Sequence, residues 1–491
     1  MAFQRDGAAA AAWRRGLSAG LILAALTLSA LPVQAEWRRA ETANFVVYGE
    51  GSEGDLRPHA EKLERFDALL RRQFNRPALE GVRKLPVYLL HTRRDLAELY
   101  PAMAERNAGG FYSASETDVY AAVNRRNGDD LLFHEYAHHF MHQNFPGFYP
   151  GWFTEGFAEF FMTARVDNPE RIEMGGFNPG RVQTLNQSRW LPVEDLLSKR
   201  PGDFTTREQR WAFYAQSWLL THYLLADAER RRGLDAYLAD MGRGVAPIEA
   251  LQNRLGHTPE SLTAALRAYL RGEMKYVRFP MTDIQPQVRI ETLPPSADRM
   301  LLYGLRSRYP QSSQDAAALL ERTRADAARY PQDRLALVTL GRAELQWGDA
   351  PAGEAALNRA LAVAPEDAEA LRLLADARLK AADAQQDPAE RGRLVREARG
   401  YLARALDADP TDYRIFAALA RTRRDAADYP NANDLETWRL AVAFAPQVMR
   451  LRLEAAEALA EGGEAEEAAA MLAVVANNPH EAGAGRDEAA D

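Results

Sequence analysis

The sequence predicts an α+β domain, built from a small sheet and a helical subdomain, followed by an all-α solenoid of helical repeats. Short β-like segments occur in the first quarter of the chain, and helical segments follow them. Residues 278–300 carry four prolines and no helical period, which indicates a domain boundary. Beyond them, prolines recur at positions 331, 365, 410, 446 and 479. Such a period is typical of stacked helical pairs.

Residues 1–35 are predicted to be an export signal rather than part of the fold. Three arginines precede the apolar run "GLSAGLILAALTLSAL", which is too short to span a bilayer comfortably. The small residues of "VQA" then suit cleavage after Ala35. We therefore expect an exported protein, periplasmic or secreted, that keeps no stable membrane span after cleavage. The alternative is a retained membrane anchor.

The composition excludes several classes of protein and of site. A formal net charge of −8 argues against nucleic-acid binding, because contacts with phosphates need clusters of basic residues. The chain has no cysteine, which excludes a thiolate nucleophile and any Cys-ligated zinc or iron–sulfur site. A metal would therefore need His, Asp or Glu ligands.

Residues 36–278 are predicted to form the α+β domain. "NFVVYG" and "LPVYLL" are β-branched and aromatic runs, and the amphipathic "LRPHAEKLERFDALLRRQF" lies between them. This order predicts a strand, a helix and a second strand. "GGFYSASETDVYAAV", residues 109–123, predicts a hairpin with a polar turn. After Asp129 nearly every segment has a helical period.

The C-terminal region is predicted to contain a linker with leading helices (residues 279–330), repeats (331–479) and a disordered tail (480–491). "LALVTLGRAELQWGDAPAGEAALNRALAVAP" places Gly341 and Gly353 where two helices would touch, and resembles the tetratricopeptide pattern of 34 residues. The insertion "AADAQQDPAERGRL" is expected to lengthen a turn. The alternative is an irregular helical bundle rich in alanine and proline.

The stretch "FHEYAHHFMHQNF", residues 133–145, holds four of the nine histidines of the chain. It contains H-E-x-x-H, with His134 and His138 one helical turn apart on the same face, about 6 Å along the axis. Two imidazoles at that spacing can bind one zinc ion. Glu135 can then reach a metal-bound water rather than the metal.

A second motif supplies the missing ligand. "GWFTEGFAEFF", residues 151–161, places Glu155 and Glu159 four apart in an aromatic segment, where buried carboxylates are costly unless a cation or hydrogen bonds compensate them. A catalytic zinc site needs three protein ligands and one open position. His134, His138 and Glu155 would be the ligands. Glu159 would accept a hydrogen bond from the other ring nitrogen of a ligating histidine.

H-E-x-x-H followed by "WFTEGFAE" resembles the gluzincin metallopeptidases, and in particular the peptidase MA-like domains of bacterial proteins. The resemblance covers roughly residues 36–275. It implies a zinc cofactor with Glu135 as general base, and it implies that the zinc ligands are His134, His138 and Glu155. Glu159 matches the acidic residue one turn beyond the third ligand. The gap of 17 residues between His138 and Glu155 is slightly shorter than in thermolysin.

Two further roles depend on the resemblance. Aminopeptidase N-like enzymes place a catalytic tyrosine on a comparable downstream helix, which makes Tyr214 in "FYAQSWLLTHYLL" the candidate donor to the oxyanion. The alternative is a core tyrosine. Gluzincin-like domains also hold an extended substrate against an edge strand, so Gly110, Phe111 and Tyr112 are candidate substrate-binding residues. The alternative is an ordinary hairpin that packs its aromatic rings inward.

The leading hypothesis is an exported zinc metallopeptidase that hydrolyses peptides or proteins with a zinc-activated water and Glu135 as base. Its repeats would bind the substrate or a protein partner. In the alternative, the zinc domain is a weakly active or inactive scaffold, and the repeats provide protein binding or assembly. The intact Glu135 argues against this, because a structural site has no use for a base beside its ligand. A hydrolase of non-peptide amides is a third possibility.

Overall fold

The computed structural model describes residues 36–78, 81–99, 109–145, 147, 149–309 and 311–476. The predicted export signal and the predicted disordered tail lie outside these residues. Among the helices that are described, none is both long enough and apolar enough to cross a membrane.

Six strands form the main sheet: β1 (Trp37–Glu41), β2 (Phe45–Glu50), β3 (Leu85–Leu90), β4 (Gly110–Ala114), β5 (Val119–Asn124) and β8 (Arg289–Thr292). Their order is β4-β5-β3-β2-β1-β8. The β2–β3 and β3–β5 pairs are parallel, and the other neighbours are antiparallel. The predicted strand–helix–strand unit and the predicted hairpin are both present, since α2 (Glu53–Phe74) connects β2 to β3 and β4 turns into β5.

The sheet extends beyond the predicted domain boundary. β7 (Val277–Phe279) pairs with β6 (Ile172–Met174) in a second small sheet, and β8 pairs with the outer edge of β1. The segment predicted as a linker after residue 278 therefore contributes a strand to the N-terminal domain. Only four residues form β8, between proline-containing segments, which is too short for alternation of apolar residues to reveal it.

Helices cover both faces of the sheet. Alternation along β3 sends Val87 to the face packed by α2 and α5 (Asp129–Asn144), and Tyr88 to the opposite face. That opposite face carries α3 (Arg93–Leu99) and α13 (Ala297–Arg306). The helix that contains H-E-x-x-H is thus α5, and it lies on one defined face of the sheet.

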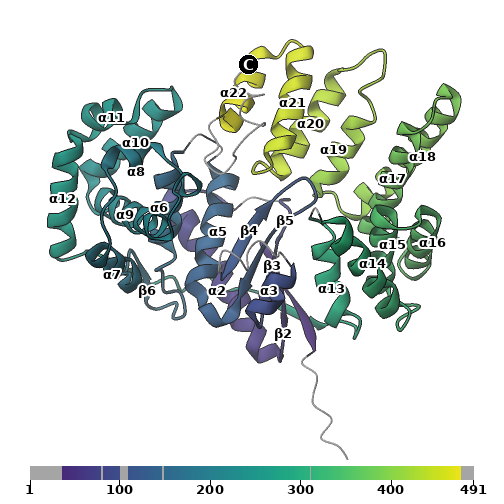
Figure 1. Ribbon diagram of the computed structural model, residues 1–491, viewed down its shortest axis with the longest axis horizontal. Helices are drawn as coiled ribbons and strands as arrows, with labels where there is room; N and C mark the ends of the chain where they lie inside the picture. Colours follow the sequence, from purple (N-terminus) through teal and green to yellow (C-terminus); the bar gives the residue numbers. More distant parts are fainter. Residues whose placement is uncertain are drawn as a thin grey trace, which may run out of the picture.

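The helical subdomain lies to one side of the sheet (Figure 1). It contains α6 (Gly151–Phe161), α7 (Pro179–Gln187), α8 (Val193–Ser198), α9 (Arg207–Leu225), α10 (Ala228–Gly242), α11 (Pro247–Ala250) and α12 (Pro259–Arg271). Short 3₁₀ turns, Arg125–Asn127 and Pro201–Asp203, and a π-helical turn, Leu251–Leu255, complete the N-terminal region.

The repeat domain continues from α13 through nine more helices, which are α14 (Ser313–Ala327), α15 (Arg334–Trp347), α16 (Ala350–Val363), α17 (Ala368–Asp383), α18 (Pro388–Ala408), α19 (Tyr413–Arg421), α20 (Ala432–Phe444), α21 (Met449–Glu461) and α22 (Ala465–Ala476). A helical pair follows each of the predicted punctuation sites Pro331, Pro365, Pro410 and Pro446. α15 and α16 approach closely at Gly341 and Gly353, as the pattern predicts. The predicted helical pairs are therefore confirmed.

One detail of the repeat prediction is wrong. The insertion between Pro365 and Pro410 does not lengthen a turn, because only residues 384–387 separate α17 from α18. Asp387 caps the first turn of α18 and Pro388 occupies its first position, so the helix begins early and runs for 21 residues. The additional residues therefore lengthen a helix.

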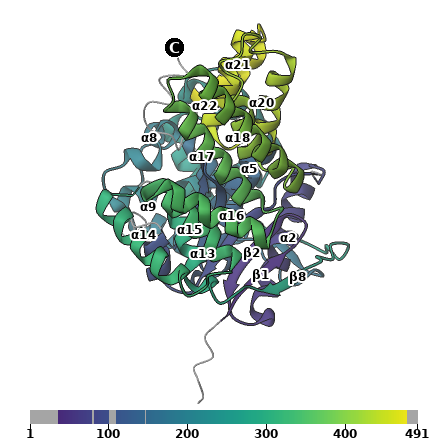
Figure 2. The same ribbon diagram turned by 90° about the vertical axis from the view of Figure 1, so that its right-hand side faces the viewer.

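The repeats, which we call the arm, curve around the sheet (Figures 1 and 2). At its start, α13 packs on one face of the sheet. At its end, apolar residues of α19–α21 join the same buried cluster as residues of α5 and β5. The arm therefore contacts the N-terminal domain at both of its ends.

Candidate metal centre

The position of α5 is set by contacts with α2. The first residue of α5, Asp129, accepts hydrogen bonds from Nδ1 of His59 (3.1 Å) and Nζ of Lys62 (2.6 Å). One turn further on, the ring of Phe133 stacks on Phe66 with 4.2 Å between the centroids. These contacts hold one side of α5 and leave another side of the helix to meet α6.

Three ligand atoms converge where α5 meets α6. The Nε2 atoms of His134 and His138 lie 3.1 Å apart, and each lies 3.5 Å from Oε2 of Glu155. A tetrahedral zinc ion with bonds of about 2.0–2.1 Å separates its ligand atoms by about 3.3 Å. The three residues are 9%, 8% and 4% exposed, respectively. The donor types and their spacing therefore fit Zn²⁺, and within the described residues this is the one group of three ligand-type side chains that converges.

The charges at this position favour a cation. Burial lowers the pKa of His134, but the hydrogen bond with Glu155 and the negative charges of Glu159 and Glu135 outweigh burial and raise it to about 9. Three carboxylates around a buried imidazole are costly unless positive charge compensates them. The charges are those expected around a divalent ion.

A glycine allows α6 to bring Glu155 to this position. α6 packs against α9 at Gly156, where a Cβ atom would lie 2.5 Å from the carbonyl oxygen of Ser217 and 2.1 Å from Oγ1 of Thr221. No side chain fits in that space without moving a helix. The glycine in "TEGFAE" therefore permits the close approach of α6 to α9, and this approach sets the position of the neighbouring Glu155.

Glu159 lies on the far side of His134. Its Oε1 is 3.6 Å from Nδ1 of His134, the ring nitrogen that does not face Glu155. Both carboxylate oxygens of Glu159 accept hydrogen bonds from Arg181, and the one from Nε of Arg181 is 2.7 Å long. Glu159 is 1% exposed, so this pair neutralises a fully buried charge.

Arg181 was not predicted from the sequence. It lies on α7, 22 residues beyond Glu159, in a segment with no recognisable motif. The only signal in the sequence was indirect, because a buried carboxylate needs a positively charged or hydrogen-bonding partner. That requirement does not say which arginine supplies it.

Glu135 faces the edge strand of the sheet. It is buried, and burial raises its pKa, while a hydrogen bond from the backbone amide of Tyr112 acts in the opposite direction. Antiparallel strands alternate between residues that bond to the neighbour and residues that point outward. The outward-pointing backbone groups of β4 are therefore those of Gly110, Tyr112 and Ala114, and they face the side on which Glu135 lies.

The structure brings only some of the predicted substrate-binding residues to this position. Phe111 packs on the opposite face of the sheet, against Tyr120 and Tyr309. Gly110 is needed for packing within the sheet, because a Cβ atom there would lie 2.7 Å from Cγ1 of Val123. Tyr112 approaches Glu135 with its backbone. The inward-packing alternative therefore describes Phe111.

The side chain of Tyr112 points toward His139 rather than the ligand group. Its hydroxyl lies 3.1 Å from Nδ1 of His139. Burial, together with the positive charges of Arg71 and Arg83, lowers the pKa of His139 to about 3, so its ring is neutral. His139 is a buried, hydrogen-bonded residue outside the ligand group.

Tyr214, on α9, lies near the two acidic residues of α6. The charge of Glu155 and burial raise the pKa of the Tyr214 phenol well above its usual value, and the charge of Glu159 acts in the same direction. The guanidinium of Arg181 lies over the Tyr214 ring, 5.3 Å from its centroid. The phenol therefore stays protonated, and its O–H group can donate a hydrogen bond. His222, on the same helix, forms hydrogen bonds with Tyr269 and with the backbone carbonyl of Gly175.

No protein-family model matches this chain, and a search of curated proteins finds no match. Among solved structures, the chain is similar to TTC0263, described as a thermophilic TPR protein in Thermus thermophilus. The two are 17% identical, the match covers 38% of this chain and 93% of that chain, and the TM-score is 0.33. The chain is also similar to MamA, with 14% identity, a match that covers 34% of this chain and 95% of that chain, and a TM-score of 0.27. Scores this low carry no conclusion about the metal centre.

Proposed function

We propose that this protein is a zinc metallopeptidase of the gluzincin type. One observation supports the proposal most directly: His134, His138 and Glu155 present three ligand atoms at zinc spacing, next to a buried glutamate. A zinc ion held by these ligands would supply a Lewis acid that lowers the pKa of water and polarises a carbonyl group.

The residues of the chain then have separate roles. Glu135 takes a proton from the attacking water and delivers it to the leaving amine. The phenol of Tyr214 donates a hydrogen bond to the oxyanion. Glu159, held by Arg181, orients the ring of His134 through Nδ1.

The proposed substrate is a peptide in an extended conformation. β4 is an edge strand, and its outward-pointing backbone groups face the side of Glu135. A peptide that pairs with this edge would place a backbone carbonyl near the ligand group. Backbone pairing recognises any extended chain, so side-chain preference must come from the walls of the site.

The second candidate function is protein binding or assembly by the arm on a zinc-holding scaffold with little turnover. The observation that favours it is the run of helical pairs from α15 to α22, since stacked helical repeats present extended binding surfaces. The two candidates differ in whether Glu135 is needed.

The deciding experiment measures zinc content and peptide hydrolysis in the purified full chain. We expect about one zinc ion per chain, and we expect Glu135→Gln to retain zinc while losing hydrolysis by at least about a hundredfold. Glu436→Gln, an exposed change on α20, is the matched control and should leave both unchanged. A chain without zinc would refute the site. Zinc without hydrolysis in wild type and variant alike would favour the scaffold.

A further inference from the structure

The turn of the β4–β5 hairpin consists of four consecutive residues, 115–118, and each of them contacts the arm. The Tyr413 hydroxyl donates a hydrogen bond of 2.6 Å to the carbonyl oxygen of Ser115, and Nη1 of Arg414 donates one of 3.1 Å to that of Thr117. Oγ1 of Thr117 donates to the carbonyl oxygen of Arg308. The carboxylates of the turn pair with arginines of the arm, Glu116 with Arg421 and Asp118 with Arg308.

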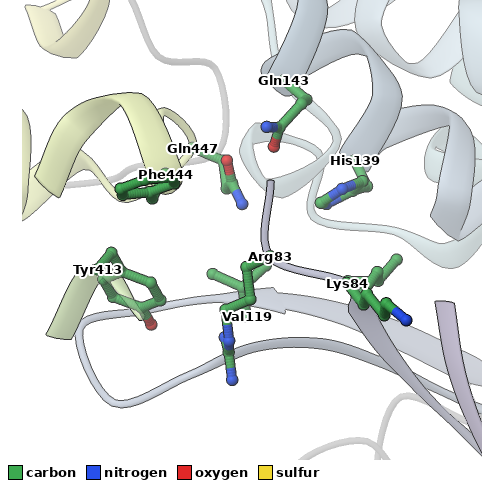
Figure 3. Close-up of a pocket in the computed structure, with 9 residues that line it drawn as sticks. Arg83, Lys84, Val119, His139, Gln143, Tyr413, Phe444 and Gln447 are labelled. Atoms are coloured by element: carbon green, nitrogen blue, oxygen red, sulfur yellow. The ribbon is translucent and has the colours of Figure 1, made fainter. Parts of the chain in front are cut away.

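These contacts join segments that are far apart in the sequence. Tyr413 and Ser115 are separated by 298 positions. A second contact lies beside the turn, in the pocket shown in Figure 3, where Tyr413 and Gln447 of the arm face His139 and Gln143 of α5. A side-chain hydrogen bond also links Gln447 to Tyr112 of β4. The arm therefore reaches both the turn and the strand.

Buried charges specify this arrangement. Arg308, Arg372 and Arg414 are largely buried in the arm, where they lie beside the carboxylates of Asp412 and Glu369, and Arg308 also pairs with Asp118 of the turn. A buried network of this kind is stable only when its partners are all in place. The network therefore favours a single position of the arm against the turn.

β4 needs such support. It has five residues, pairs with β5 on one side only, and forms the outer edge of the sheet. Short edge strands belong to the least stable parts of a fold. The amide that reaches Glu135 is in the middle of this strand. Any displacement of the turn would move the backbone that faces Glu135.

We propose that Tyr413, together with the ion pair between Arg421 and Glu116, positions the peptide-binding edge strand, so that the arm controls substrate binding within the same chain. The proposal rests on the proposed function, because it assigns β4 to the substrate. The hydrogen bond to the carbonyl oxygen of Ser115 and the ion pair with Glu116 hold the turn in place and thereby keep β4 in register beside Glu135.

The test compares full-length, zinc-loaded variants. Tyr413→Phe removes one hydroxyl but keeps the ring under the guanidinium of Arg83, and Glu116→Gln removes one exposed ion pair. In the double variant we expect KM for a peptide substrate to rise about fivefold, as for the loss of about one hydrogen bond, with kcat changed less than about twofold. The zinc content should stay the same. Amide hydrogen exchange in Gly110–Ala114 should become faster.

The matched control is Glu98→Gln. It removes a different ion pair between the arm and the sheet domain, with Arg322 at 3.1 Å, away from the hairpin. We expect it to leave KM and the exchange of β4 unchanged. An unaltered KM and unaltered β4 exchange in the double variant would overturn the proposal. If wild-type protein lacked zinc or hydrolysis, the proposed function would fail, while the exchange measurement would still decide whether the arm holds β4.

Discussion

Arg181 donates two hydrogen bonds to the carboxylate of Glu159, whose Oε1 lies 3.6 Å from Nδ1 of His134. Three helices meet in this contact, since α7 supplies the arginine, α6 the glutamate and α5 the histidine. The buried carboxylate is neutralised on one side and faces a proposed zinc ligand on the other. The pair therefore links the helical subdomain to the metal centre. A substitution of Arg181 on α7 should consequently affect how the zinc ligand His134 on α5 is held.

Arg181→Gln should weaken zinc retention without changing a ligand. The variant leaves Glu159 buried without its charged partner, and we expect a loss of about 2–3 kcal/mol in the free energy of unfolding. Because the ring of His134 would be held less firmly, zinc affinity should fall about tenfold or more. Competition with a chelator measures the affinity. Arg171→Gln, at an exposed pair with Glu173, should change neither quantity.

Glu155→Ala and Glu159→Ala should differ in their effect on zinc. Glu155 supplies a ligand oxygen, so its removal should abolish stoichiometric zinc after dialysis. Glu159 lies beside the nitrogen that faces away from Glu155, so its removal should lower affinity by about 10–100-fold. Metal analysis of both variants tests the order. Equal zinc retention by the two variants would contradict the assigned roles.

Gly156→Ala should disturb the site although it adds only one methyl group. The new Cβ would meet the backbone of α9 at 2.5 Å, which forces α6 and Glu155 to move. We expect a cost of about 1–3 kcal/mol in stability and reduced zinc content. Gly400→Ala is the control, because a Cβ at that exposed helical position contacts nothing within 4 Å. It should stabilise the protein by about 0.5–1 kcal/mol.

Asp129 should make the stability depend on pH in the acid range. The hydrogen bond from His59 and the contact with Lys62 lower the pKa of Asp129 from 3.8 to about 2, despite an opposing effect of burial. Because the folded pKa is the lower one, this stabilisation is present above pH 4 and is lost as the pH falls toward 2. Since the side chain is 23% exposed, we expect about 1–2 kcal/mol at pH 7.

The measurement compares Asp129→Asn with wild type in urea unfolding. The difference between wild type and Asp129→Asn in the free energy of unfolding should be largest at pH 7 and should decrease as the pH falls below about 4. Asp195→Asn, at an exposed pair with Lys199, should show almost no difference at either pH. A constant difference for Asp129→Asn between pH 7 and pH 3 would show that its ion pair is not the cause.

Much of the fold could be predicted from local patterns. The strands β2 and β3, the β4–β5 hairpin and helix α2 appear close to their predicted positions, because each carries a strong local pattern, and H-E-x-x-H lies on a helix as its spacing requires. The helical pairs of the arm follow the prolines. β1 and β8 were missed, since short strands at or near the edge of a sheet carry weak patterns and depend on their neighbours.

In the candidate site, too, some residues could be placed from the sequence and others could not. H-E-x-x-H specifies its own geometry, because residues four apart on a helix share a face, and His134 and His138 do converge. The meeting of α5 with α6 brings in Glu155, which a second motif predicted. The side to which Phe111 turns could not be predicted, because a strand buried on both faces gives its aromatic residues two possible environments.

The candidate metal ligands, the candidate base and the helical pairs of the arm could all be predicted from the chain alone, because each depends on spacing within one or two neighbouring elements. The fold was needed to show that Arg181 neutralises Glu159 and that Tyr413 holds Ser115 at the turn of the hairpin. Those contacts cross 22 and 298 positions of the chain, and each is one of many pairings that charge or hydrogen bonding alone would allow. Packing of the whole fold selects between them, and no local period records that choice.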